Sequence, residues 1–278
     1  QSRIASCIAP MATVATAFDR LCRVIQSNEQ FTDTKGLARV GAGGFFLGLT
    51  LMAGLQLVIF SPTLGQFGAY VFCISLFHWL EFFLTSLFNP HTLSFDSYLL
   101  NHSPEYHTAM GASVVEYFIE SLVFPSMKNF WPVTCLGVTI ALTGQTIRTW
   151  AMWEAASNFT HQIAEVKREN HQLVVDGIYR LCRHPSYCGW FWWALGTQVI
   201  LINPVSIVAY ALVSWRFFRD RISIEENYLD EFFPEKYQKY RREVWSGIPG
   251  VDGVWVPNSL RLSSLAAALG VMATKSDT

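Results

Sequence analysis

Two short segments that lie far apart in the sequence carry most of the residue types that could do chemistry. The first reads Arg183-His184-Pro185-Ser186-Tyr187, and the second runs from Arg216 to Glu226. Proline fits the first turn of a helix, where its missing N–H costs nothing, so the first segment predicts a helix start whose free N–H groups could receive an anion. If the second segment is helical, Arg221 and Glu225 lie one turn apart on the same face.

The spacing alone leaves two interpretations of these segments open. They could form a basic anchor at the lipid headgroups, followed by a solvated helix. Against that interpretation stand the many ionisable and hydrogen-bonding groups beside an aromatic run, Trp190-Phe191-Trp192-Trp193. Ionisable groups that face inward at a membrane boundary are candidates for function. The residue types therefore favour a functional site built from both segments.

The elements that must position these residues are indicated by the distribution of charge. The chain has 278 residues, of which 51% are hydrophobic and only 15% charged, with a mean hydropathy of +0.26. A soluble domain carries about 25% charged residues. Four windows hold no Asp, Glu, Lys or Arg: 40–60, 62–80, 129–147 and 185–215. Because a helix needs about 20 apolar residues to cross the hydrocarbon, these windows predict membrane spans.

We therefore predict an all-α, multi-spanning integral membrane helix bundle of six to eight spans with a small cytosolic cap. Six spans are expected at residues 37–60, 66–88, 110–127, 131–153, 187–202 and 204–218. Asn203-Pro204 divides the last window into a hairpin of two short helices. Residues 4–25 could form a further span or an interfacial helix.

The hairpin predicts where the two chemical segments meet. A helix pair that goes down and back returns both ends to one membrane surface, so residues 179–190 and 214–226 should lie together there. Lys and Arg gather on that surface, which makes it the cytosolic one by the positive-inside rule. We expect three regions: amino-terminal transmembrane helices at 1–153, a catalytic region at 154–258 that includes the hairpin 187–218, and a tail at 259–278.

Several function classes are disfavoured. The net charge of −1 argues against a general role in binding nucleic acid. The six cysteines show no paired spacing, so a disulfide framework is not expected. No ligand pattern repeats on one helix face, so no metal site is predicted. The polar residues within the spans, His78, Glu81, Glu116 and Glu120, are expected to make intramembrane hydrogen bonds, while His102 and Glu105 could line the site.

The motifs carry a resemblance. The segment Arg183–Tyr187, followed by Gly189-Trp190, resembles the R-H-P-x-Y-x-G signature of integral-membrane methyltransferases, and the segment from Arg216 to Glu226 looks like their second motif. Residues 101–106 and 157–161 resemble more specific segments of the isoprenylcysteine carboxyl methyltransferase family. The similarity covers roughly residues 67–250. The first motif alone also resembles a run in membrane sterol reductases of the C14 and C7 type.

The resemblance implies S-adenosylmethionine as the cofactor and a set of residues around it. These are Ala164, where family members often carry glutamine, with His171, Gln172, Leu173, Val174, Tyr179, His184, Pro185, Ser186, Tyr187 and Glu225. It also implies that Arg221 is the catalytic residue that holds the substrate. The residue chemistry agrees, because a carboxylate suits the ammonium of S-adenosylmethionine and a guanidinium can hold a carboxylate by two parallel hydrogen bonds.

The implied reaction is methylation of the C-terminal carboxylate of a prenylated cysteine, farnesyl or geranylgeranyl, on proteins processed at a C-a-a-X sequence. Membrane lipid is the other expected partner, since a slot between spans would keep the prenyl chain in the bilayer. The glycines between 41 and 54 could create such a slot or serve ordinary helix packing. The expected location is the endoplasmic reticulum membrane, with the site facing the cytosol. A sterol reductase using NADPH, a phospholipid methyltransferase and a non-enzymatic lipid-binding protein stay open as alternatives.

Overall fold

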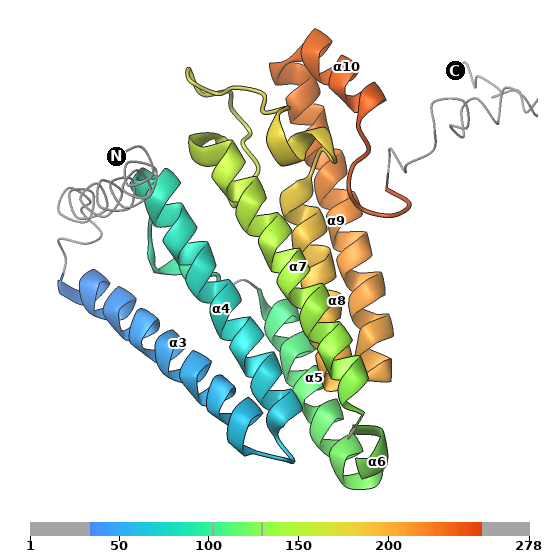
Figure 1. The fold of residues 1–278 in the computed structure, drawn as a ribbon. Helices are drawn as coiled ribbons and strands as arrows, with labels where there is room; N and C mark the ends of the chain where they lie inside the picture. The colour runs from blue at the N-terminus through green and yellow to red at the C-terminus, as the bar shows by residue number, and fades with distance from the viewer. Residues whose placement is uncertain (1–33, 102, 129, 252–278) are drawn as a thin grey trace, which may run out of the picture.

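The computed structural model describes residues 34–101, 103–128 and 130–251, and this part of the chain is all helical (Figure 1). The longer helices are α3 (Thr34–Phe60), α4 (Gly65–Phe88), α5 (Pro104–Val123), α7 (Trp131–Ala155), α8 (Pro185–Leu201), α9 (Pro204–Phe232) and α10 (Pro234–Glu243). A short α6 (Pro125–Lys128) and 3-10 turns at Pro90–Thr92, Phe95–Tyr98, Ala156–Asn158 and Gly177–Arg180 join them. The expectations for residues 4–25 and 259–278 lie outside the described residues.

Proline sets most of the helix starts. Pro104, Pro185, Pro204 and Pro234 are each the first residue of their helix. The helix of the third predicted span begins at Pro104, before the predicted span start at 110, because Pro104 follows Ser103, whose hydroxyl accepts a hydrogen bond from the Tyr106 N–H and caps the helix. That helix also ends at Val123, before Pro125, rather than at 127.

The last span was predicted to end at 218, and the helix that contains it continues beyond that point, as the spacing of Arg221 and Glu225 had assumed. Helix α9 continues unbroken for 29 residues to Phe232, about 43 Å at 1.5 Å per residue. The apolar window ends near Trp215, but loss of apolar character does not stop a helix. Phe233 stops it, since this residue precedes Pro234 and its backbone has left the helical conformation, with φ −139° and ψ 58°. Helix α9 therefore carries the second chemical segment beyond the bundle as one rigid element.

Glycines bring the helices close to one another. A Cβ on Gly144 of α7 would lie 2.5 Å from the Trp193 backbone nitrogen of α8, so only glycine permits this approach. A Cβ on Gly54 of α3 would lie 2.7 Å from the Gly68 carbonyl oxygen of α4. Of the two roles left open for the early glycines, Gly54 serves helix packing.

Two of the described helices are long and apolar enough to cross a membrane by length and composition, the segments Gly36–Phe60 and Gly65–Phe88. Several large side chains of α3, including Phe45, Leu49 and Ile59, are more than half exposed, as expected of a lipid-facing surface. The remaining helices carry charges, as α5 does with Glu105, or are short, as α8 is with 17 residues. The all-helical architecture is confirmed, and the number of spans stays a prediction.

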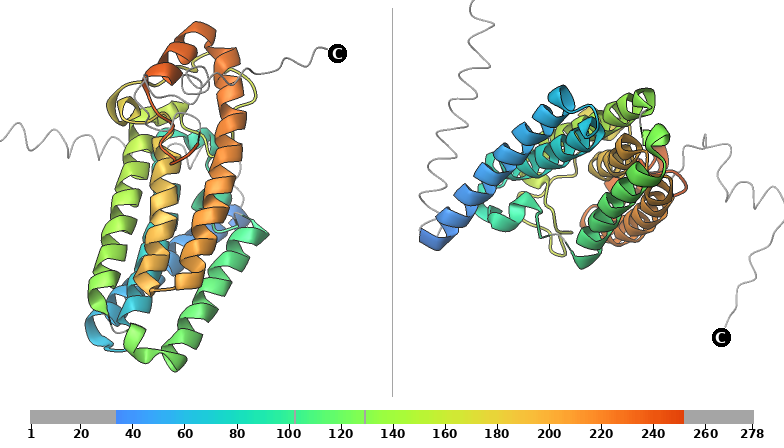
Figure 2. Two further views of the ribbon diagram at one scale, coloured as in Figure 1. Left: turned by 90° about the vertical axis from the view of Figure 1, so that its right-hand side faces the viewer. Right: turned by 90° about the horizontal axis from the view of Figure 1, so that it is seen from below.

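The cap lies at one end of the bundle. The segment between α7 and α8, the end of α9 and helix α10 gather there (Figures 1 and 2). At the opposite end the α8–α9 hairpin is fixed by acids of α5. Glu116 accepts hydrogen bonds from the backbone N–H groups of Val205 and Ser206 at 2.8 Å each. Lys128 binds Glu120 at 2.6 Å and the carbonyl oxygen of Leu201 at 2.8 Å. The hairpin is thus anchored at its turn.

Candidate active site

A cavity of about 840 Å³ lies between the cap and the adjoining ends of α8 and α9. Its lining includes every residue predicted to bind the cofactor: Ala164, His171, Gln172, Leu173, Val174, Tyr179, His184, Pro185, Ser186, Tyr187 and Glu225. The two chemical segments meet here, as the hairpin predicted, although what they bind is not tested by this arrangement.

We call this cavity the polar pocket. Sequence reasoning missed several other residues that line it. Tyr228, Leu229 and Phe232 follow Glu225 at positions that share its helix face. They could have been found by continuing the α9 periodicity past Glu226. Tyr237 and Tyr240 come from α10 and close the pocket from above, which no local pattern indicates.

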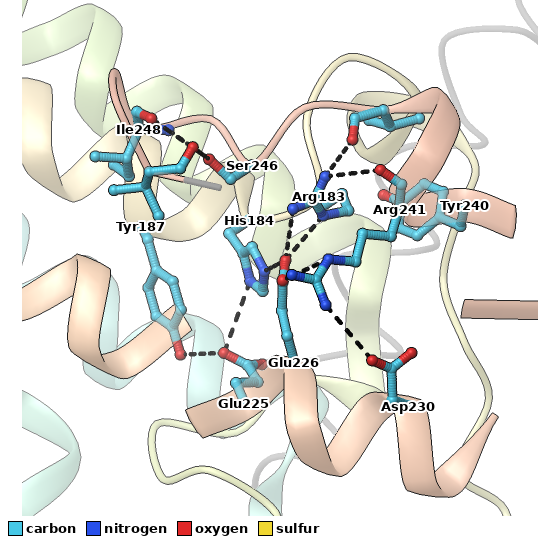
Figure 3. Close-up of polar contacts among 12 residues, drawn as sticks. Arg183, His184, Tyr187, Glu225, Glu226, Asp230, Tyr240, Arg241, Ser246 and Ile248 are labelled. Carbon is cyan, nitrogen blue, oxygen red and sulfur yellow. Dashed lines mark hydrogen bonds and ion pairs between the residues drawn. The ribbon is translucent and has the colours of Figure 1, made fainter. Parts of the chain in front are cut away.

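The neighbouring glutamates of the second segment have different partners (Figure 3). Glu226 is buried and accepts hydrogen bonds from Arg183 Nε and Nη2 at 2.9 and 2.7 Å and contacts His184 Nε2 at 3.1 Å. Arg241 Nε lies 3.2 Å from its other oxygen. Burial alone would raise the pKa of Glu226, but the hydrogen bond and charge of His184 and the charge of Arg183 lower it to about 2. Glu226 is therefore a structural anion that joins the cap to α8.

The start of α8 is also held by the backbone. The N–H groups of Arg183 and His184 donate to the carbonyl oxygens of Trp245 and Ser246 at 2.8 and 3.0 Å. With its ring on Glu226 and its N–H on Ser246, His184 is fixed in place (Figure 3). These bonds leave the backbone N–H groups of the following helical turn, rather than His184 itself, to face an anion.

Tyr187 joins the two predicted functional residues of α9. Its hydroxyl donates to Glu225 Oε2 at 2.6 Å and accepts from Arg221 Nε at 2.9 Å. Arg221 Nη2 donates to the His161 carbonyl oxygen at 2.5 Å. The predicted one-turn spacing of Arg221 and Glu225 is confirmed, because both reach the same tyrosine.

Arg221 lies outside the polar pocket, in a small adjoining one that we call the passage. The passage holds about 330 Å³ and is lined by Leu99, Arg148, Phe159, Thr160, His161, Tyr187, Trp190, Phe217 and Arg221. Phe159, Thr160 and Tyr187 also line the polar pocket. Trp190 and Phe217 also line a third cavity on the other side.

This third cavity, the apolar pocket, holds about 1020 Å³ between α4, α5, α8 and α9. Ile74, Met110, Ala194 and Val213 are among its apolar lining residues. Of the two residues that could line the site, Glu105 borders this cavity and His102 lies outside the described residues. Along α9, Glu225 lines the polar pocket, Arg221 one turn earlier lines the passage, and Val213 about two turns before that lines the apolar pocket.

A charged pair that sequence reasoning missed lies beside the passage. Glu81 of α4 was expected to make hydrogen bonds, and it does so, but its partner had not been identified. It accepts from Arg148 of α7, with Nε and Nη2 at 2.5 and 2.7 Å from its two carboxylate oxygens, and Arg148 lines the passage. His161 Nε2 lies 2.7 Å from Glu81 as well. The available signal was the position of Arg148 directly after the charge-free window 129–147.

Comparison with known proteins gives a consistent result. Residues 136–231 match the model of the isoprenylcysteine carboxyl methyltransferase family. The chain is 46% identical over 217 residues to the protein-S-isoprenylcysteine O-methyltransferase of Dictyostelium discoideum, an alignment that covers 78% of this chain and 91% of that protein. It is 43% identical over 211 residues to the human protein of the same name, covering 76% and 74% of the two chains.

The fold is similar to a solved structure, that of the eukaryotic intramembrane Ras methyltransferase, isoprenylcysteine carboxyl methyltransferase. The TM-score is 0.78 at 37% identity, over 89% of this chain and 87% of that one. The sterol reductase and non-enzymatic alternatives are not favoured by any of these matches. The expected enzyme class, a membrane methyltransferase, is confirmed. The chain belongs to the isoprenylcysteine carboxyl methyltransferase family.

Proposed function

We propose that the chain transfers a methyl group from S-adenosylmethionine to the C-terminal carboxylate of a prenylated cysteine on C-a-a-X-processed proteins, forming a methyl ester. One observation carries this proposal. A polar pocket, a passage with an arginine and an apolar pocket follow one another along α9. A methyl donor, a carboxylate and a prenyl chain need these three environments in this order. The names of the relatives agree with this substrate.

The polar pocket suits S-adenosylmethionine. The Nδ1 atom of His171 is buried there and has no hydrogen-bond partner among the described residues. Burial and the charges of Arg168 and Lys167 lower the pKa of His171, which favours a neutral ring at physiological pH. Such an atom indicates a missing ligand. Glu225 would bind the ammonium of the cofactor, and Leu173 and Val174, with the other predicted residues, would enclose its adenine.

When bound, S-adenosylmethionine supplies a methyl group on a positively charged sulfur. The chain then has to orient the carboxylate and exclude water from it, because a C-terminal carboxyl group with a pKa of about 3.3–3.7 is already an anion at neutral pH. Arg221 is placed for this role. Within the described residues its two hydrogen bonds use Nε and Nη2, so Nη1 can donate to the substrate. No general base is required.

The apolar pocket would hold the prenyl chain. Each CH₂ group withdrawn into water would cost about 0.8 kcal/mol, so a cavity between the helices avoids extracting the lipid. Its walls come from α4, α5, α8 and α9, and not from the early glycines of α3, which were considered as the source of a slot. The small side chains of Ala109, Ala194 and Ala209 line it and leave room for a chain.

We further propose six spans within the described residues, with the cap in the cytosol and the protein in the endoplasmic reticulum membrane. Basic residues support this orientation, since the cap carries Lys167, Arg168, Arg180, Lys236, Lys239, Arg241 and Arg242. The proposed regions remain 1–153 for the amino-terminal helices, 154–258 for catalysis and 259–278 for the tail. The catalytic region draws on α4 and α5 as well, because both line the apolar pocket.

Isothermal titration of the detergent-purified chain with S-adenosylhomocysteine and with NADPH tests the cofactor. Heat is expected with the first ligand alone, and binding of NADPH alone would overturn the proposal. A second assay supplies N-acetyl-S-farnesylcysteine with labelled S-adenosylmethionine. We expect the acid to gain a methyl label that base releases, and we expect no label on the corresponding C-terminal amide, supplied as a control. Label on the amide would exclude esterification of the carboxylate.

A further inference from the structure

Glu81 is the centre of a buried charged network. Glu81 belongs to α4, and its side chain is fully buried. Its carboxylate binds Arg148 of α7 and the ring of His161 in the segment that follows α7. Arg148 is 1% exposed, and its Nη1 donates to the Ser186 hydroxyl at 2.7 Å. The network therefore joins α4, α7, the start of α8 and the segment of the cap between α7 and α8.

This network borders the reaction site. Arg148, His161 and Arg221 all line the passage. Two guanidinium groups thus border the space that a substrate carboxylate must enter. They differ in what they can offer, because Glu81 and Ser186 together occupy Nε, Nη2 and Nη1 of Arg148, whereas Arg221 keeps Nη1 for a substrate.

Without Glu81, Arg148 would be a buried cation with no counter-ion. A buried charge of this kind strongly attracts an anion, and the substrate carboxylate is the anion that enters the passage. A carboxylate held by Arg148 would be drawn away from Arg221 and from its position for transfer. A misplacement of about 1 Å costs a reaction of this kind about 100-fold in rate.

His161 supplies the second link. Its ring is held by Glu81 at 2.7 Å, and its own carbonyl oxygen accepts from Arg221 Nη2 at 2.5 Å. The same glutamate therefore fixes the acceptor that aims the substrate-binding arginine.

We propose that Glu81 is a positioning residue for the methyl transfer. It neutralises Arg148, so that the carboxylate binds Arg221 alone, and it holds His161, so that Arg221 points into the passage. This inference rests on the proposed function.

The test compares Glu81→Gln with the double variant Glu81→Gln/Arg148→Gln in the full chain. The readouts are kcat, KM for N-acetyl-S-farnesylcysteine, and the inhibition constant of its C-terminal amide, which carries no charge. In the single variant we expect kcat to fall about 100-fold. The acid should bind about tenfold more tightly, and the amide as in the unaltered chain. In the double variant the affinity for the acid should return to normal and part of kcat should recover.

A matched control is Glu120→Gln, which also removes a buried acid from a cation, Lys128, but lies away from the passage. A merely structural role for Glu81 predicts the same kinetics for both single variants, and that result would overturn the proposal. So would equal changes in acid and amide binding.

Binding of S-adenosylhomocysteine reports folding. If the single variant fails to bind S-adenosylhomocysteine, the double variant is compared with Arg148→Gln alone. Glu81 still holds His161 in Arg148→Gln but not in the double variant, so activity of the double variant equal to or above that of Arg148→Gln contradicts the proposal. Lack of methylation by the unaltered chain would instead reject the proposed function.

Discussion

Two buried glutamates hold the catalytic region, and they do so in different surroundings. Glu226 binds Arg183 and His184 in the cap, and it also contacts Arg241, whose side chain is 38% exposed. Glu81 binds Arg148 and His161 with no exposure of its own. Both pair one carboxylate with an arginine and a histidine, so the chemistry is shared and the environment differs.

The difference shows what each pair contributes. The Glu226 group, which is Glu226 with Arg183 and His184, joins segments of the cap to one another. Arg183 and His184 of this group line the polar pocket. The Glu81 group joins helices that are far apart in the sequence and borders the passage. A buried ion pair adds little stability over an apolar pair, but removing one partner is costly. We therefore expect the Glu81 group to be the more sensitive to loss of one charge.

The largest effect is expected from Arg148→Leu, which leaves Glu81 away from water with only the ring of His161 as a partner. We expect a loss of about 3–5 kcal/mol in the free energy of unfolding, measured by thermal unfolding in detergent. Arg183→Leu should cost less, because Arg241 and His184 still face Glu226. Equal losses would remove the distinction between the two groups.

The cap should contribute to the pH dependence of stability. Because the pKa of Glu226 is lowered from 4.5 to about 2, its contribution is complete above pH 4.5 and is lost as the pH falls toward 2. At 1.36 kcal/mol per pKa unit this amounts to about 3 kcal/mol. Unfolding in denaturant between pH 6 and 2 measures it, and Glu226→Gln should flatten this part of the profile. An unchanged slope in that variant would contradict the assignment.

The variant Arg221→Lys tests the proposed role of Arg221 in holding the substrate carboxylate. A lysine keeps the charge but loses the planar pair of donors, so activity should fall about 100-fold. Binding of S-adenosylhomocysteine and the unfolding temperature should be unchanged, because Arg221 lies in the passage and outside the polar pocket. Near-normal turnover would remove Arg221 from the mechanism.

The smallest effect is expected from Tyr187→Phe. This change keeps the ring and removes the hydroxyl that joins Arg221 to Glu225. Loss of a charge-assisted hydrogen bond predicts about a tenfold fall in kcat/KM. Arg221 keeps its bond to the His161 carbonyl, which limits the loss. A fall as large as that of Arg221→Lys would show that the tyrosine itself is essential.

The sequence was sufficient for the parts that depend on local pattern. Charge-free windows predicted α3, α4, α7 and α8 and the start of α9, and the hairpin predicted that residues 179–190 and 214–226 would meet. The residues that the resemblance implied for the cofactor all line one pocket. The end of α9 could not be read from apolar character, because the helix follows hydrogen bonding until Phe233.

The Glu81 group could not be predicted in the same way. Glu81 and Arg148 lie 67 positions apart, and neither belongs to a motif with the other. Their pairing depends on the packing of α4 against α7, which a single sequence does not specify. In contrast, Arg183 and Glu226 each sit in a recognised motif, and the hairpin brings those motifs together.

The unbroken course of α9 limits how the chain can change in length. Ser206 borders the apolar pocket and Glu225 the polar one, about 28 Å apart along a single helix. Inserting or deleting one residue between them would rotate everything beyond that point by about 100°. Arg221 and Glu225 would then leave Tyr187 while the lipid-facing half stayed in place. We expect α9 to accept substitutions on its exposed side but no insertion or deletion between 209 and 225. The α3–α4 junction at residues 61–64, which lies outside all three cavities apart from the helices it joins, is where length variation can be absorbed.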